Sequence, residues 1–146
     1  MLPSSERLEA TLVAPGRLVV ARYAAVDPAR MVPVQTSIGR PRWVGFDVIA
    51  WPAVMPWGLF GRDLEPEEFR RAYRRRLHQR TPRILGELAE LLAAYDPYPL
   101  ALCCFEDLRD GSRWCHRTIL AEWIGERVGV EVPDLEEVAA TRNPSM

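Results

Sequence analysis

Reactive side chains are concentrated between positions 104 and 117 of the sequence. Cys104 lies in an apolar run that Glu106 closes, and Cys115, His116 and Arg117 follow a polar turn. A thiol beside an imidazole and a guanidinium favours the thiolate, the form that acts as a nucleophile or redox group. His116 would be the base or the ion-pair partner of Cys115, and Glu106 a general acid/base or the group that orients His116. Cys104, on the same strand face as Glu106, belongs to this predicted catalytic set.

A strand and a helix are expected to position these residues. Residues 100–105 are apolar at every position, which is typical of a central strand covered by helices on both faces. Cys115 and His116 precede Ile119 and Leu120 of the next apolar stripe by one helical turn, so both should face inward. They would lie at a helix N-terminus beside the carboxyl edge of a sheet, where open α/β sheets bind ligands and where helix N–H groups receive anions.

A purely structural interpretation of these residues is equally compatible with their types. A Cys-His pair at a helix start also occurs as a packed thiol and a hydrogen-bonded imidazole. Cys103 is expected to fill the core. Donor atoms for zinc are present at Cys104, Glu106, Cys115 and His116, but the C-x-x-C spacing is absent and we assign no metal site.

Earlier segments predict further strands and loops at the same edge. Residues 17–23 and 31–37 are strand candidates, and a turn that contains Ser37 and Arg40 follows the second. No glycine-rich phosphate-binding motif is present. If the loops converge, Arg22 and Arg40 would hold an anion together with Arg117. The aromatic segment 44–61 is expected to cover the core as a packed loop, with a pocket wall or a partner surface as the alternatives.

Two helices are predicted between Leu64 and Asp96, separated at Thr81-Pro82, where Thr81 would be the N-cap. The first has an apolar stripe and many arginines. Its arginine-rich face, residues 70–83, is either solvated or contacts phosphates, as in a nucleic-acid binding module.

The whole chain limits these alternatives. With 146 residues, 48% of them apolar, it predicts one domain with a sizeable core. The net charge of -1 provides no overall attraction to nucleic acid or to an anionic membrane. The longest uncharged run, 48–61, contains two prolines and predicts no membrane span. Three cysteines without an export signal predict reduced thiols in the cytoplasm.

These motifs resemble the phage-type branch of the family catalogued as domain of unknown function 488. The resemblance covers about residues 17–135, and the segment Val54-Met55-Pro56 departs from the Ala-Pro of that pattern. It implies a compact α/β fold with the motif residues in one site, and it names no activity. The matching positions are Arg22, Tyr23, Ser37, Gly39, Pro41, Phe69, Tyr73, Leu102, Cys104, Glu106, Trp114, Cys115, His116, Arg117, Ala121, Glu122 and Trp123.

We therefore expect a three-layer, Rossmann-like α/β fold with a mostly parallel sheet flanked by helices. Residues 17–135 would form this domain, between an N-terminal extension (1–16) and a C-terminal tail (136–146). The expected function is an enzyme acting on a small anionic or nucleotide-like substrate, and the alternative is a nucleic-acid or protein binding module. The sequence names no cofactor, reaction or oligomeric state. The expected substrate-binding residues are Arg22, Tyr23, Ser37, Arg40 and Arg117.

Overall fold

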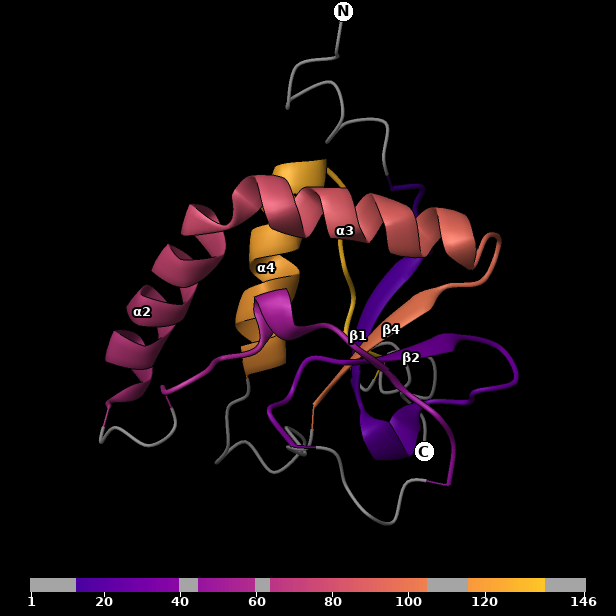
Figure 1. Ribbon diagram of the computed structural model, residues 1–146, viewed down its shortest axis with the longest axis horizontal. Helices are drawn as coiled ribbons and strands as arrows, with labels where there is room; N and C mark the ends of the chain where they lie inside the picture. The colour runs from indigo at the N-terminus through magenta and orange to yellow at the C-terminus, as the bar shows by residue number, and fades with distance from the viewer. Residues whose placement is uncertain (1–12, 40–44, 60–63, 105–115, 136–146) are drawn as a thin grey trace, which may run out of the picture.

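A four-stranded, all-parallel sheet forms the centre of the protein (Figure 1). The computed structural model describes residues 13–39, 45–59, 64–104 and 116–135. Its strands are β1 (Leu18–Arg22), β2 (Val32–Gln35), β3 (Ile49–Ala50) and β4 (Leu100–Cys104), in the spatial order β1-β4-β2-β3. The last strand in sequence therefore lies between the first two. This confirms the α/β class and the parallel sheet expected from the sequence.

The strand register aligns three carboxyl ends at one edge of the sheet. Arg22 of β1 is opposite Cys104, and Gln35 of β2 is opposite Cys103. Because all strands run in one direction, β1, β2 and β4 end at the same edge. Pro33 lies near the start of β2, before the Val34–Gln35 pairing with β3, so its missing N–H leaves that pairing intact.

Within the described residues, three α-helices accompany the sheet: α2 (Pro66–Gln79), α3 (Thr81–Ala94) and α4 (His116–Val128). A capping box between Glu65 and Glu68 closes the start of α2. The break between α2 and α3 occurs where the sequence predicts it, but the N-cap of α3 is Arg80 and not Thr81. The Thr81 hydroxyl instead donates backward to the His78 carbonyl at 2.7 Å. Along the described parts of the chain, no helix is both long and apolar enough to cross a membrane.

The sheet buries apolar side chains on both faces. One face packs against α2, α3 and α4 through a large cluster that includes Val20, Leu102 and Trp123. The opposite face packs against the short 3-10 helix η1 (Tyr23–Ala25) and nearby segments. Cys103 belongs to this second cluster with no exposed surface, and its burial raises its pKa to about 12. Cys103 is thus a core thiol, as the sequence predicted.

The described part of the aromatic segment, residues 45–59, covers the core. It contains β3 and the 3-10 helix η2 (Pro52–Val54), and the side chains of Trp51, Val54 and Met55 are buried. The Tyr73 hydroxyl donates to the Val54 carbonyl at 2.5 Å and ties this cover to α2. Covering of the core is therefore confirmed for this stretch.

Candidate functional site

Six of the nine predicted site residues lie at the carboxyl edge of β1, β4 and β2. Their positions are connected by the strand register and by hydrogen bonds across the edge. Arg40, Glu106 and Cys115 lie outside the described residues, so their predicted roles stay predictions. The six predicted site residues that the structure describes are Arg22, Tyr23, Ser37, Cys104, His116 and Arg117.

His116 begins α4 and is almost completely buried, with 1% of its surface exposed. Its Nε2 lies 3.0 Å from the carbonyl oxygen of Thr36 and 3.1 Å from the Thr36 hydroxyl. A carbonyl oxygen only accepts, so Nε2 carries the hydrogen. Nδ1 then holds the lone pair of the neutral ring. The imidazole and the Tyr73 ring are nearly perpendicular, with an interplanar angle of 85° and centroids 5.7 Å apart.

This environment keeps His116 neutral at pH 7. Burial lowers its pKa to about 4, against the hydrogen bond to Thr36, which favours the charged form. The positive charge of Arg117 lowers the pKa further. Of the two roles expected for His116, the uncharged ring favours the base over the ion-pair partner. A neutral imidazole also removes one of the expected causes of an acidic Cys115, the charge of the neighbouring histidine.

Arg117 is completely buried beside His116. Its Nε donates to Oδ2 of Asp134 at 2.9 Å, and its Nη1 donates to Sγ of Cys104 at 3.0 Å. Asp134 follows Pro133 in a segment that runs parallel to β1, where the Val20 N–H donates to the Pro133 carbonyl at 2.9 Å. The guanidinium expected to bind a substrate anion therefore already binds two groups of the chain.

Cys104 corrects one expectation from the sequence. It is disulfide-bonded in the structure, to a partner outside the described residues, whereas the sequence predicts reduced thiols. Cysteine count and spacing indicate the number of thiols, but bond formation depends on how close two sulfur atoms come in the fold. A nucleophilic role for Cys104 consequently requires reduction first.

Tyr23 and Ser37 form a buried hydrogen-bonded pair that joins the ends of β1 and β2. Their hydroxyl oxygens lie 2.7 Å apart. The Ser37 hydroxyl donates to the Gly39 carbonyl at 2.5 Å, so the Tyr23 hydroxyl is the donor to Ser37. This pair holds the turn after β2 against the end of β1. Its predicted role in ligand binding stays a prediction.

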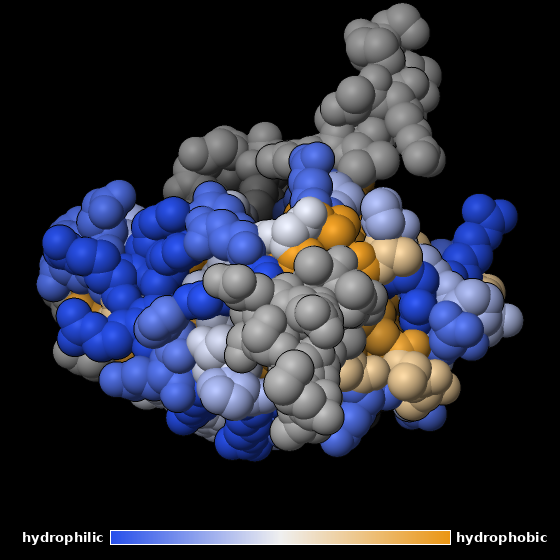
Figure 2. Space-filling view, turned by 90° about the horizontal axis from the view of Figure 1, so that it is seen from above, coloured by the Kyte–Doolittle hydropathy of each residue, from blue (hydrophilic) through white to orange (hydrophobic). Residues whose placement is uncertain are grey.

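Most arginines of the 70–83 face contact other parts of the chain. Arg70 and Arg74 of α2 form ion pairs with Glu122 and Glu126 of α4, each at 2.7 Å. Three further arginines of the 70–83 face have partners: Arg76 donates to the Trp57 carbonyl, Arg80 to the Ala53 carbonyl and Arg83 to the Glu87 carboxylate. Arg71 and Arg75 are exposed. Figure 2 shows hydrophilic residues over the side of the molecule where α2 lies in Figure 1.

The ion pairs between α2 and α4 should contribute little to stability. Replacing both Glu122 and Glu126 with Gln should lower the free energy of unfolding by about 1–2 kcal/mol at most, because partly exposed pairs contribute about 0.2–1 kcal/mol each. Urea denaturation measures the change. The matched control, Arg71→Gln with Arg75→Gln, should leave stability unchanged, and a larger loss in the control than in the Glu variant would contradict this assignment.

Nucleic-acid binding by α2 would depend on Arg71 and Arg75. If the unmodified protein binds a single-stranded oligonucleotide at low salt, Arg71→Gln with Arg75→Gln should flatten the log-log salt dependence by about one unit per lost contact. Tyr73, the aromatic residue among these arginines, has no exposed surface for base stacking. Equal salt slopes for the two proteins would remove α2 from any nucleic-acid interface.

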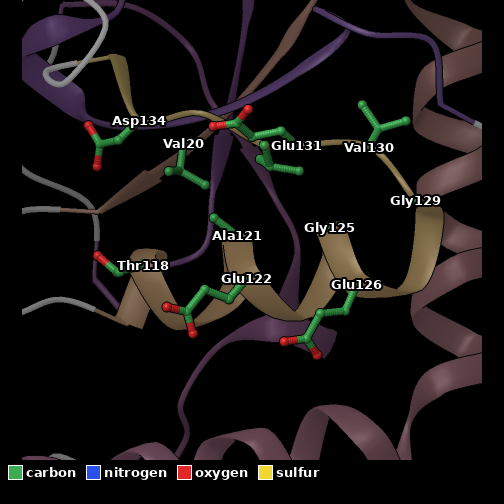
Figure 3. Close-up of a pocket in the computed structure, with 11 residues that line it drawn as sticks. Val20, Thr118, Ala121, Glu122, Gly125, Glu126, Gly129, Val130, Glu131 and Asp134 are labelled. Atoms are coloured by element: carbon green, nitrogen blue, oxygen red, sulfur yellow. The ribbon is translucent and has the colours of Figure 1, made fainter.

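A groove of about 560 Å³ runs along α4 on the side of the segment 130–134 (Figure 3). Glu122 and Glu126 come from α4, and Glu131 and Asp134 from the opposite wall. In Figure 3, Thr118 and Asp134 lie at the same end of the groove. The Asp134 carboxylate thus both lines the groove and pairs with the buried Arg117. The sequence did not predict this groove. Residues 118–126 and residues 129–134 face each other only when the chain has folded.

Within residues 13–39, 45–59, 64–104 and 116–135, no three histidine, cysteine or acidic residues are grouped so that they could hold a metal ion. Two of the four donors considered from the sequence, Glu106 and Cys115, lie outside these ranges.

The fold and the site define this protein as an α/β protein with a parallel sheet and a polar cluster at the carboxyl edge of that sheet. No family model, curated protein or solved structure matches the chain.

Proposed function

We propose that this protein is an enzyme that acts on a small anionic or nucleotide-like molecule at the carboxyl edge of its sheet. The supporting observation is that Arg22, Cys104, His116 and Arg117 converge where three parallel strands end and α4 begins. Parallel α/β sheets bind ligands at this edge. No other group of described residues combines a base, a sulfur and two guanidinium groups.

The charges at this edge suit an anion. The first N–H groups of α4 carry partial positive charge, and Arg22 and Arg117 add two full charges. Asp134 compensates Arg117 across 2.9 Å, and His116 is neutral. We assign the main contact with the substrate anion to Arg22, because it lies half-buried at the end of β1, at the edge where the parallel strands end.

His116 is suited to accept a proton. At pH 7 its ring is neutral, and Nε2–H is fixed on Thr36, so that Nδ1 is the basic nitrogen. A pKa of about 4 makes a weak base. An anion bound beside the ring would raise this pKa toward neutrality, because negative charge favours the imidazolium. Substrate binding would thereby strengthen the base at the moment it is needed.

Anion binding tests the proposal directly. Calorimetric titration with inorganic phosphate and with a nucleoside monophosphate should show binding by the unmodified protein. Arg22→Gln should weaken that binding about tenfold or more, as expected for the loss of a charge-assisted contact. Arg30→Gln is the matched control, since Arg30 is exposed and forms an ion pair with Asp27, three residues before it in the chain.

Two results would contradict the proposal. One is the absence of binding by the unmodified protein at about 10 mM ligand, which corresponds to less than about 3 kcal/mol of binding free energy. The other is equal weakening by Arg22→Gln and by Arg30→Gln. Circular dichroism spectra of both variants should match that of the parent, so that a loss of folding is separated from a loss of the anion contact.

A further inference from the structure

We infer that Arg117 stabilises the thiolate of Cys104, so that Cys104 is the sulfur released when its disulfide is reduced by an external dithiol. This inference concerns the redox chemistry of one buried cluster and does not depend on the proposed anionic substrate. Three described residues carry it: Cys104, Arg117 and Asp134.

The geometry directs one edge of the guanidinium at the sulfur. Asp134 accepts the Nε hydrogen of Arg117 at 2.9 Å and fixes the plane of the group. Nη1, on another edge of the same plane, then lies 3.0 Å from Sγ of Cys104. Arg117 and Cys104 have no exposed surface, and the Asp134 side chain is 10% exposed. A charge-assisted hydrogen bond is strongest where water does not compete with it.

The surrounding charges favour a negative sulfur. The groups that α4 contributes near the sulfur are the positive Arg117 and the neutral His116. Strand β1 contributes Arg22, which is opposite Cys104 in the register. From the segment beside β1, Asp134 is the facing carboxylate. Among these groups the Arg117 guanidinium is in hydrogen-bond contact with Sγ of Cys104, and its positive charge favours the thiolate.

Cys103 provides an internal comparison. It is adjacent to Cys104 in β4 and equally buried, but its side chain belongs to the cluster on the opposite face of the sheet. Its sulfur donates to the Ala101 carbonyl at 3.2 Å, and burial raises its pKa to about 12. Arg117 acts on Cys103 only through its charge, whereas it donates a hydrogen bond directly to the sulfur of Cys104.

The chemistry that follows is thiol–disulfide exchange. A thiolate of the external dithiol attacks the sulfur bonded to Cys104, and a mixed disulfide forms. The bond to Cys104 breaks, and the electron pair leaves on Sγ, where Arg117 stabilises it without a proton. The second thiol of the reductant then resolves the mixed disulfide, so that the reductant leaves oxidised and the partner sulfur leaves reduced. Exchange is faster when the departing thiol is more acidic.

Titration of single-cysteine proteins tests the inference. A protein with Cys103→Ser and Cys115→Ser retains only Cys104, and one with Cys104→Ser and Cys115→Ser retains only Cys103. Thiolate absorbance at 240 nm is followed against pH, a measurement that needs no access of a reagent to the buried sulfur. Cys104 should titrate at least about one pH unit below the ordinary 8.5, and Cys103 well above it.

A variant without the ion pair completes the test. In the Cys104-only protein, Arg117→Met together with Asp134→Asn removes both charges of the buried ion pair at once. The Cys104 midpoint should then rise above 8.5. Arg74→Met with Glu126→Gln removes a matched pair between α2 and α4 and should leave the midpoint unchanged. A midpoint at or above 8.5 in the Cys104-only protein overturns the inference, whether or not the variants fold, and so does a midpoint unaffected by loss of Arg117.

Discussion

Acidification from pH 7 to pH 4 should destabilise the folded protein by about 3 kcal/mol through His116 alone. Burial holds the pKa of this imidazole at about 4, against 6.5 for an unconstrained histidine. Below pH 6.5 the unfolded chain therefore binds a proton that the folded protein does not. The stabilising effect of the neutral ring is complete above pH 6.5 and is lost as the pH falls toward 4.

Urea denaturation at several pH values measures this effect against a variant. His116→Gln retains an N–H group that can donate to the Thr36 carbonyl, but it does not titrate. The difference in free energy of unfolding between the parent and His116→Gln should shrink by about 3 kcal/mol between pH 7 and pH 4. Working with this difference cancels the contributions of the carboxylates, which titrate in both proteins.

The second histidine of the chain is the control. His78 is exposed near the end of α2, and His78→Gln should leave the pH dependence of the parent in place. If the parent and His116→Gln lose stability in parallel between pH 7 and pH 4, His116 is not held neutral by the fold. Its assignment as the base of the proposed site would then fail as well.

Loss of Arg117 should strongly destabilise the folded protein. Arg117→Met leaves the Asp134 carboxylate nine-tenths buried without its cation, which should cost about 3–5 kcal/mol. Asp134→Asn removes the carboxylate to which the buried Arg117 guanidinium donates, and it should also be strongly destabilising. The double variant should be more stable than the sum of the two losses predicts, by about 2 kcal/mol or more, because no buried charge remains.

A double-mutant cycle on an exposed ion pair, Arg74–Glu126, provides the comparison. The Arg74–Glu126 pair has a similar distance, 2.7 Å, but 59% of the Glu126 side chain is exposed. Arg74→Met, Glu126→Gln and their double variant should show a coupling of less than about 1 kcal/mol. Coupling energies of equal size in the two cycles would show that burial is not what makes the Arg117–Asp134 pair important.

Much of the fold could be predicted from local patterns in the sequence. The apolar run of β4 and the interruption at Thr81-Pro82 define elements because hydrophobic periodicity and proline act over a few residues. The strand β3 was missed, since its two residues are ordered by pairing with β2 and not by their own propensity. Asp134 was missed for a similar reason: nothing near it in sequence indicates that it reaches Arg117, 17 positions away.

The sequence by itself determined that His116 faces inward at the start of α4 and that Cys104 lies in a buried strand. Only the tertiary structure decided their chemical states. The pKa of His116 depends on its burial, which includes a ring contact with Tyr73, and on the nearby charge of Arg117. Spacing along the chain sets neither of these. Arg117 was expected to bind a substrate, and the fold gave it Asp134 and Cys104 as partners. Desolvation and Coulomb energies depend on distance and solvent exposure, which become defined only when the sheet, α4 and the segment beside β1 have packed together.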